Sequence, residues 1–550
     1  MATLRGIKRN LIGKKTPVLF SKIRSTIETT FYRNNIVQVK SLEEAYNLAK
    51  NSSGTIITDF PVYKPEEMDL PEDSKVLIFN DGSRTGRTAA ARKIIGKEGV
   101  DEEEYAKKLR DAAFQSRNKK MYCASCVVGL HEDFMVRAHL IVPEGYENLL
   151  YSWMLNFQVL DDEFMKKYNG SKVIEEGDIF VYSDPDWEDV EHPLGLTLFD
   201  SEHNCCALLG MKYFGEHKKG TLTLAWAIAA RNGFTACHGG QKRYNLSNDE
   251  KYVVSVFGLS GSGKSTITHA KHDGKYDITV LHDDAFIISN KDGSSVSLEP
   301  TYFDKTQDYP TDSEDNKFLL TLQNCAATID DNGKVVPVTE DIRNGNGRAI
   351  KSKLWTPNRA YKFTKKCDAI FLLMKDESLP PVVKINSPVL GAVMGATLAT
   401  KRTTAEHVLK AEDREKLVIE PYANPFRTYP LADDYNNFKS LFDNMGIECY
   451  VLNTGFFLHK KVTPEITLGI IEDIVEKKAK FKNFGDMSCM QYLEIEGYKP
   501  PLDDINYINL LEVRMEKRLE SVNNLRGFDR LPYEAGEGLH KVLDKINSLR

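Results

Sequence analysis

Hydrophobic positions in the N-terminal part of the chain fall into short runs of differing period. Apolar residues spaced three or four apart over 41–50 predict a helix, whereas the β-branched runs at 55–60 and 75–79 predict strands. From 118 to 236 the runs are mostly strand-like and separated by polar turns, with one helix expected at 152–157. This order predicts a mixed α/β domain.

The pattern changes near residue 250. Residues 252–257 (YVVSVF) are apolar at almost every position, as expected for a strand buried on both faces inside an α/β sheet. The stretch GLSGSGKS follows at 258–265 and fits the pattern G-x-x-x-x-G-K-[ST], and residues 265–270 open as a helix. A strand, a glycine loop and a helix in this order predict a phosphate-binding loop.

The residue types in this loop suit a nucleotide. Its glycines permit backbone conformations that a Cβ would block, so successive N–H groups can point at phosphate oxygens. Lys264 can reach the β- and γ-phosphates, Ser265 can bind Mg²⁺, and the following helix directs its positive end toward the anion. The predicted nucleotide-binding residues of the loop are Ser260, Gly261, Ser262, Gly263, Lys264, Ser265 and Thr266.

An acidic pair follows the next predicted strand. The apolar run 278–281 ends at His282, Asp283 and Asp284. Carboxylates at the end of a strand beside a phosphate loop are placed like the acid that holds a nucleotide's divalent cation. The alternative is an ordinary polar turn after a strand.

Composition narrows the function further. The 550 residues are 41% hydrophobic and 28% charged with a formal net charge of −6, which is typical of a globular protein of two or more domains. The net negative charge of the chain does not favour nucleic-acid binding. No apolar stretch is long enough to span a membrane, and none has the pattern of a secretory signal. We therefore expect a cytoplasmic protein that binds small anions, not nucleic acid or a membrane.

Nine scattered cysteines do not form a disulfide framework. Cys123 and Cys126 make a C-x-x-C, but no second pair at zinc-ligand spacing follows. The residues after them, 127–142, have the pattern of two hairpin strands around a polar turn, not of a redox site. We expect this pair, and Cys205 with Cys206, to be reduced structural thiols.

The loop and the acidic pair resemble the kinase loop of the ATP-dependent phosphoenolpyruvate carboxykinase family. Further segments resemble that family in the same order over roughly residues 85 to 460. In chain order they are TGR (85–87), YFGEHKKG (213–220), ACHGG (236–240), LEPTYFDKT (298–306), GNGRAI (345–350), LPPV (379–382) and VLNTGF (451–456).

The resemblance implies an α/β phosphoenolpyruvate carboxykinase-like fold with an active-site cleft between two domains. A substrate-binding domain is expected over 1–235, and a phosphate-loop nucleotide-binding domain over 236–550, with a helical extension at about 480–550. Members of the family decarboxylate oxaloacetate and transfer the nucleotide's γ-phosphoryl group to the resulting enolate, giving phosphoenolpyruvate and CO₂.

The family's functional residues are carried over position by position. The resemblance implies a Mn²⁺ site made by Lys219, His238 and Asp284, while Mg²⁺ accompanies the nucleotide on Ser265. It implies that Arg87 clamps the substrate carboxylate and that Glu299 belongs to the nucleotide site. The residues implied as catalytic are Arg87, Tyr213, Lys219, His238, Lys264, Asp283, Asp284 and Arg348.

Departures from the family pattern leave alternatives open. After NTG the chain reads FFLHKKVT in place of a glycine-rich segment, so ATP, GTP and pyrophosphate all remain possible phosphoryl partners. After TGR it reads TAAARK, which alters the expected carboxylate pocket. Residues 395–406 loosely resemble the lid segment and are expected to be a mobile loop.

Two other functions are therefore kept beside a carboxykinase. One is a phosphate-loop kinase of the same scaffold that acts on another small carboxylate or on a protein serine, as the related HPr kinase does. The other is a nucleotide-binding regulator without turnover. The expected assembly is a monomer or a small homo-oligomer.

Overall fold

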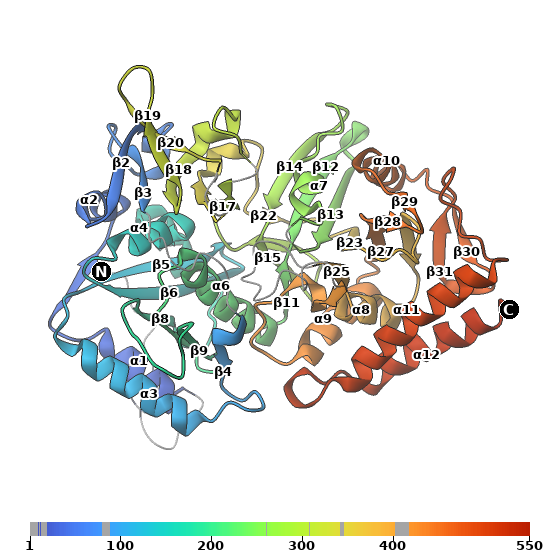
Figure 1. The fold of residues 1–550 in the computed structure, drawn as a ribbon, viewed down its shortest axis with the longest axis horizontal. Helices are drawn as coiled ribbons and strands as arrows, with labels where there is room; N and C mark the ends of the chain where they lie inside the picture. The colour runs from blue at the N-terminus through green and yellow to red at the C-terminus, as the bar shows by residue number, and fades with distance from the viewer. Residues whose placement is uncertain are drawn as a thin grey trace. The chain divides into compact units, whose positions relative to one another are not determined.

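The computed structural model describes residues 9, 12, 19–79, 89–259, 261–306, 309–340, 346–401 and 417–550. The chain forms two compact units (Figure 1). Unit 1 contains the described residues up to Ile228 together with Leu298–Pro357, and unit 2 contains Ala229–Ser297 and the described residues from Asn358 to the C-terminus, apart from a segment outside the described ranges. A single cut near residue 235 does not describe these units, because residues 298–357 pack with the N-terminal part.

The main sheet of unit 1 has the strand order β1-β5-β6-β8-β10-β9-β4, with β7 paired to β5. β5 and β6 form the hairpin that the sequence predicts. The strands are β1 (Ile36–Val39), β4 (Arg92–Ile94), β5 (Met121–His131), β6 (Phe134–Pro143), β7 (Gln158–Val159), β8 (Ile179–Asp184), β9 (Leu196–Asp200) and β10 (Cys205–Leu209).

Helices cover both faces of this sheet because alternate strand residues point to opposite sides. α1 (Lys22–Thr30) and α3 (Glu102–Gln115) bury Ile23 and Leu109 against one face, with Cys123 among the strand residues beneath them. α6 (Phe214–Arg231) covers the opposite face, where Gly220 lies against Cys206 and Leu208. α4 (Glu147–Asn156) packs beside α6, and α5 (Asp162–Gly170) follows it.

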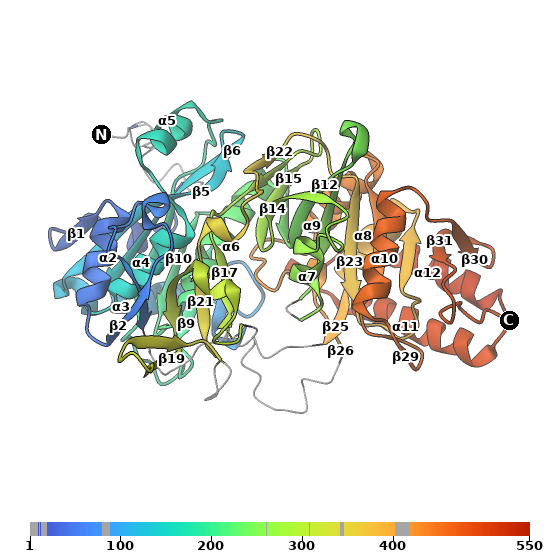
Figure 2. The same cartoon turned by 90° about the horizontal axis from the view of Figure 1, so that it is seen from above.

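A second sheet of unit 1 has the order β17-β21-β18-β3-β2 and brings residues 298–357 to the N-terminal part. β3 pairs with β18 in parallel, although 240 positions separate Phe79 from Leu319 in the sequence (Figure 1). β17 and β21 of the same sheet lie side by side (Figure 2). The hairpin β19–β20 and helix α2 lie near it. The elements are α2 (Leu42–Asn51), β2 (Thr55–Pro61), β3 (Lys75–Phe79), β17 (Tyr302–Lys305), β18 (Leu319–Gln323), β19 (Ala326–Ile329), β20 (Val335–Val338) and β21 (Arg348–Lys351).

The main sheet of unit 2 has the order β14-β12-β13-β23-β27-β24-β31-β30. Its central strands are buried on both faces, which explains the continuous apolar run predicted at 252–257. The strands are β12 (Gly240–Asn245), β13 (Lys251–Phe257), β14 (Asp277–His282), β23 (Ala369–Met374), β24 (Val382–Ile385), β27 (Glu448–Asn453), β30 (Phe481–Phe484) and β31 (Met487–Leu493).

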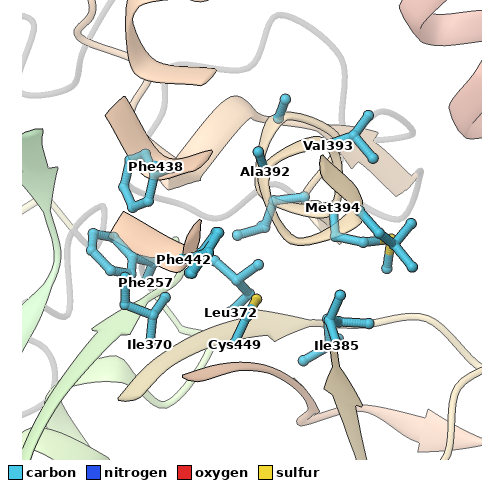
Figure 3. Close-up of a cluster of buried hydrophobic side chains, with 14 of the residues drawn as sticks. Phe257, Ile370, Leu372, Ile385, Ala392, Val393, Met394, Phe438, Phe442 and Cys449 are labelled. Carbon is cyan, nitrogen blue, oxygen red and sulfur yellow. The ribbon is translucent and has the colours of Figure 1, made fainter. Parts of the chain in front are cut away.

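Two layers of helices enclose this sheet. α7 (Lys264–His269) and α10 (Pro464–Val475) pack on one face through Ile267 and Ile471. α8 (Pro388–Ala396), α9 (Leu431–Asp443), α11 (Ile505–Asn524) and α12 (Tyr533–Asn547) form the layer on the other face. Figure 3 shows part of this second core, in which side chains of α8 and α9 lie over the strands; its labelled residues are Phe257, Ile370, Leu372, Ile385, Ala392, Val393, Met394, Phe438, Phe442 and Cys449.

Small sheets complete unit 2. The order β11-β15-β16-β22 places the last residue of β11, His238, opposite the first residue of β15, Ala285. The remaining pairs are β25–β26 and β28–β29. The strands are β11 (Phe234–His238), β15 (Ala285–Ser289), β16 (Ser295–Ser297), β22 (Lys362–Phe363), β25 (Ala399–Lys401), β26 (Leu417–Ile419), β28 (Phe456–Phe457) and β29 (Lys460–Lys461).

The C-terminal helices are anchored by a buried ion pair. α11 and α12 lie side by side (Figure 1), and their apolar faces join the core of unit 2. The Arg518 guanidinium of α11 lies 2.9 Å from an Asp376 carboxylate oxygen, and each side chain is 2% exposed. Arg518 also donates to the backbone carbonyl of Thr397. The extension expected at 480–550 is therefore helical in its last part and fixes the turn after β23.

Among the described helices, none combines the length and the apolar composition that a bilayer crossing requires. All nine cysteines are free, and eight of them, including Cys123, Cys126, Cys205 and Cys206, are buried. Burial raises the pKa of the Cys126 and Cys205 thiols well above their ordinary value, so these groups are uncharged and unreactive. The expectation of reduced structural thiols is consistent with their positions.

Replacing Arg518 with methionine should lower the free energy of unfolding by about 3 kcal/mol, because the buried Asp376 carboxylate would keep only the more distant Arg514 guanidinium, at 3.8 Å, as a counter-charge. Urea unfolding of the wild type and the variant measures this change. Lys477→Met is the matched control, since the Lys477–Glu250 pair is 68% and 54% exposed, and it should leave the unfolding midpoint where it is. Equal midpoints for Arg518→Met and the wild type would refute the anchoring role.

Candidate active site

The glycine-rich loop has the local structure that its sequence predicts. β13 ends at Phe257 and α7 begins at Lys264, so the loop connects a buried strand directly to a helix. Gly261 and Gly263 have φ angles of 79° and 95°, in the left-handed region that favours glycine. α7 is short, ending at His269. Ser260 lies outside the described residues, so its role stays a prediction.

Gly258 is required by close packing. A Cβ at this position would lie 2.3 Å from the Ser262 hydroxyl oxygen and 2.9 Å from Cβ of Leu373 on β23. The loop is therefore pressed against the neighbouring strand at its first residue. On its other side the Lys375 ammonium donates to the carbonyl of Gly261 at 3.4 Å. These contacts hold the loop from both ends.

The acidic pair is placed beside the loop, as the sequence predicts. The Lys264 ammonium lies 4.0 Å from an Asp284 carboxylate oxygen. The two backbone N–H groups of Asp284 and Ala285 donate to Nδ1 of His282 at 3.1 and 3.2 Å, which fixes the turn after β14. His282 thus shapes the acidic turn, a role that sequence reasoning did not assign to it.

Asp283 is held ionised. Burial alone would raise the pKa of its carboxyl, but the hydrogen bond from His269, at 3.3 Å, and the charges of His269, His282 and Lys264 hold the pKa below its ordinary value. A negative charge is therefore present close to the phosphate loop at neutral pH. His269, at the end of α7, was not identified from the sequence, since only its position on the helix face toward β14 reveals its function.

His238 faces Asp284 with the nitrogen that carries a lone pair. Its Nδ1 lies 2.5 Å from the carbonyl oxygen of Ala423, which can only accept, so Nδ1 carries the proton. In the neutral imidazole, Nε2 is then an acceptor, and it lies 3.1 Å from an Asp284 carboxylate oxygen. Two acceptors at this distance repel each other unless a proton or a cation lies with them. Imidazole and carboxylate are both ligands of divalent metals, so the pair fits one.

Tyr213 and Arg348 meet in unit 1. Arg348 begins β21, and its Nε donates to the Tyr213 hydroxyl at 3.3 Å. Gln323 of β18 binds both Lys212 and Phe214 through their backbones, which fixes the chain on either side of Tyr213. Among the residues that the structure describes, no partner is found for the buried Nη2 of Arg348, which is 3% exposed. A buried guanidinium nitrogen without a partner suits an anionic ligand.

Lys219 and Glu299 also belong to unit 1. Lys219 is half-buried on α6, and its ammonium lies 5.6 Å from the centre of the Trp226 ring. Glu299 is fully buried: one carboxylate oxygen lies 3.0 Å from the Lys218 ammonium, and the other accepts from the Asn156 amide at 2.6 Å. Lys218 and Asn156 thus hold the Glu299 carboxylate in unit 1, and the predicted role of Glu299 in nucleotide binding stays a prediction.

Several predicted residues cannot be placed. Arg87 and the rest of TGR lie outside the described residues, as do residues 402–406 of the expected lid segment. Within the described ranges, no group of three or more His, Cys, Asp or Glu side chains is arranged to hold a metal. His238 and Asp284, two of the three predicted metal ligands, lie together in unit 2, and their role as ligands stays a prediction. The predicted third ligand is a lysine, Lys219.

The NTG segment has a structural function that the sequence did not suggest. The Asn453 amide donates to the carbonyls of Asp376, Leu379 and Phe456 at 2.9, 2.7 and 2.8 Å. Its side-chain oxygen accepts from the N–H of Gly455 at 3.0 Å. One buried side chain therefore ties together the turn after β23 and the start of β28, both next to the contact between Lys375 and the phosphate loop.

Fold and site together define a mixed α/β protein that carries a phosphate-binding-loop sequence beside a histidine and two carboxylates. The family model for phosphoenolpyruvate carboxykinase matches residues 67–493. The chain belongs to this family, as its resemblance predicts. It is 24% identical over 413 residues to phosphoenolpyruvate carboxykinase (ATP) of Aeropyrum pernix, an alignment that covers 72% of this chain and 79% of that protein.

A second relative is the glycosomal phosphoenolpyruvate carboxykinase (ATP) of Trypanosoma brucei brucei, 25% identical over 225 residues. That alignment covers 36% of this chain and 45% of the relative.

Replacing Gly258 with alanine should lower the free energy of unfolding by about 1–3 kcal/mol, since the new methyl group would displace Ser262 or Leu373. Chemical unfolding measures the difference. Gly469→Ala on α10 is the matched control. A Cβ at this position meets no atom within 4 Å, so the substitution should raise the free energy of unfolding by about 0.5–1 kcal/mol through the higher helix propensity of alanine. Stabilisation by Gly258→Ala would show that the loop is not packed as described.

Proposed function

We propose that this protein is a nucleotide-dependent phosphoenolpyruvate carboxykinase. It would cleave the C–C bond to the β-carboxylate of oxaloacetate, releasing CO₂ and leaving an enolate. The enolate oxygen would then attack the nucleotide's γ-phosphorus, and the bond to the leaving nucleoside diphosphate would break, giving phosphoenolpyruvate. The reverse sequence is equally open to the enzyme. Family membership supports this reaction, and the observation that carries it is the approach of His238 Nε2 to an Asp284 carboxylate oxygen, at 3.1 Å, next to Lys264.

The phosphate loop supplies positioning and charge. Phosphoryl transfer requires little covalent chemistry from a protein, so oriented N–H groups and cations do most of the work. Lys264 would neutralise the charge of the γ-phosphoryl group during transfer. Residues Ser260 to Thr266 would surround the phosphates. Asp283, held ionised by His269, would orient this part of the loop. Ser265 would bind the Mg²⁺ that accompanies the nucleotide.

His238, Asp284 and Lys219 would hold a second divalent cation, which we assign as Mn²⁺. The donor set fits such an ion, since Nε2 of His238 and the Asp284 carboxylate already face each other as acceptors. Lys219 can ligate a metal only as the neutral amine, so a bound cation must depress its pKa. When bound, the ion would supply Lewis-acid stabilisation of the negative charge that develops on the enolate oxygen.

Arg348 and Tyr213 would act on the anionic groups of the substrates. The buried Nη2 of Arg348, which has no described partner, can donate to a phosphoryl or carboxylate oxygen, while its Nε stays bound to Tyr213. Arg87 would clamp the substrate carboxylate.

ATP is the nucleotide we assign, because both curated relatives are named for it. The substrates are oxaloacetate or phosphoenolpyruvate, CO₂ and the nucleotide, and the cytoplasm and a monomeric or small homo-oligomeric state stay predictions.

The reaction is tested by oxaloacetate formation from phosphoenolpyruvate and bicarbonate with Mn²⁺ and Mg²⁺, supplying ADP, GDP or phosphate in turn. Turnover is expected with ADP, and Lys219→Ala should abolish it. His238→Asn should lower kcat/KM by more than about 100-fold, because the metal loses a ligand. His540→Asn, on the exposed surface of α12, is the matched control and should leave the rate unchanged. No turnover with any acceptor, from protein that binds ATP, would favour a kinase of another substrate or a regulator.

Replacing Arg348 with methionine should lower kcat by about 1000-fold while the ATP dissociation constant changes little, since this guanidinium acts on charge that develops during transfer. Steady-state kinetics with a separate calorimetric binding measurement distinguishes the two effects. Lys353→Met, in the same unit, is the control and should retain wild-type kcat. A rise in the dissociation constant with unchanged kcat would place Arg348 in ground-state binding instead.

A further inference from the structure

Lys242 lies beneath the helix that follows the phosphate loop. It belongs to β12, between β14 and β13 in the main sheet of unit 2, and its side chain is fully buried. Its ammonium donates to the carbonyl of Ile267 at 2.6 Å and to that of Ala270 at 2.9 Å. Ile267 lies in the last turn of α7, and Ala270 is the C-cap residue that follows the helix. A buried lysine thus binds the end of the helix whose first residues are Lys264 and Ser265.

These hydrogen bonds matter because α7 is only six residues long. The last four carbonyls of any helix have no partner within it, so a six-residue helix satisfies few of its own. A cation at the C-terminal end compensates both the unpaired carbonyls and the helix dipole. Without such a partner, a single turn and a half of helix has little stability of its own.

Burial of a lysine without a carboxylate partner is costly, and it needs a functional or structural reason. No salt bridge of Lys242 is found within the described residues, and its ammonium contacts the two carbonyls and the face of the Tyr244 ring, at 4.5 Å. Burial lowers the pKa of this lysine to about 7. Its charge therefore changes across the physiological range.

The groups around Lys242 connect α7 to α10. The Tyr244 hydroxyl lies 3.0 Å from Nε2 of His272, and Nδ1 of His272 lies 2.9 Å from a Glu472 carboxylate oxygen on α10. Burial lowers the pKa of His272, so this imidazole is neutral above pH 7. The other titratable groups of this side are Lys275, Tyr276 and Glu476, which pair with one another or with Glu472.

We propose that Lys242 is a positioning residue of the phosphate loop. Its ammonium binds carbonyls at the C-terminal end of α7 and so fixes the orientation of this helix, which sets the positions of Lys264 and Ser265 at its first turn. This role deepens the proposed function and rests on it, since it concerns the same nucleotide site. Lys242 does not touch the nucleotide. Loss of its charge would loosen α7 and weaken phosphate binding.

The sign of the pH effect follows from the contacts. The ammonium binds the two carbonyls more strongly than the neutral amine does, and it also favours nearby phosphate charge. Binding of a polyphosphate should therefore weaken as pH rises through about 7. Stability shows the opposite trend. Between pH 7 and the ordinary lysine value of 10.5 the unfolded chain binds more protons than the folded one, so this lysine makes the fold more stable as pH rises over that window.

The test compares the full-length wild type, Lys242→Met and Lys384→Met. Methionine keeps the length and removes the donors. Lys384 is a lysine of β24 in the same sheet, separated from β12 by β13, β23 and β27, and paired with Glu448. The dissociation constants of ATP and of pyrophosphate, each with Mg²⁺, are measured by calorimetry from pH 6 to 8.5. Binding is measured without turnover, so the test stands even if the carboxykinase reaction fails.

Lys242→Met should raise both dissociation constants by about tenfold at pH 6, and its difference from the wild type should shrink toward pH 8.5. Lys384→Met should match the wild type at every pH. Hydrogen exchange should show faster exchange of residues 264–270 in Lys242→Met, with α10 unchanged. A dissociation constant within twofold of the wild type at pH 6, or a difference independent of pH, would overturn the proposal.

Lys242→Arg covers the case in which the methionine variant does not fold. Arginine keeps its charge at every pH used, so polyphosphate binding by this variant should weaken less from pH 6 to 8.5 than binding by the wild type or by Lys384→Met. If polyphosphate binding by Lys242→Arg declines with pH as steeply as binding by the wild type, the pH dependence belongs to another group and the proposal is overturned.

Discussion

The structure of unit 2 depends on a strand that is covered on both faces. β13 lies between β12 and β23, with one helical layer on each side, and its last residue, Phe257, is fixed in the core. The chain therefore turns at Gly258 within contact distance of Leu373, and the loop leads from the end of β13 to the start of α7. The acidic turn after β14 and His238 at the end of β11 are fixed relative to the same sheet. Rigidity at the base of the loop is what allows small side chains to be placed precisely at its tip.

Local patterns predicted the parts of the fold that local physics decides. The strand β13, the loop, the strand β14 ending at His282 and the hairpin β5–β6 follow from apolar runs and turn residues. α6 was not predicted, because it is buried and apolar around most of its circumference and so lacks the one-sided pattern of a surface helix. The return of residues 298–357 to unit 1 depends on β3 pairing with β18, a long-range contact that no local pattern reveals.

The same division holds for the site. The phosphate-loop pattern predicted Lys264, the acidic pair after a strand predicted Asp284, and the family resemblance predicted His238. They could not reveal that the Ala423 carbonyl fixes the proton on Nδ1 of His238, since 185 residues separate the two. They also could not distinguish residues that act from residues that support: Asn453 ties backbone carbonyls together, and Glu299 pairs with Lys218 inside unit 1. A conserved-looking segment can be necessary to a site without touching any ligand.

The pair formed by Arg518 and Asp376 has a consequence for the order in which the chain folds. The two residues are 142 positions apart, and the arginine lies beyond the part of the chain that the family model matches. A ribosome makes the chain from its N-terminus at about 5–20 residues per second. The Asp376 turn, next to Lys375 and the phosphate loop, must therefore wait several seconds with its carboxylate hydrated before α11 emerges and covers it. During that interval the sheet of unit 2 can form, but the turn after β23 stays uncovered.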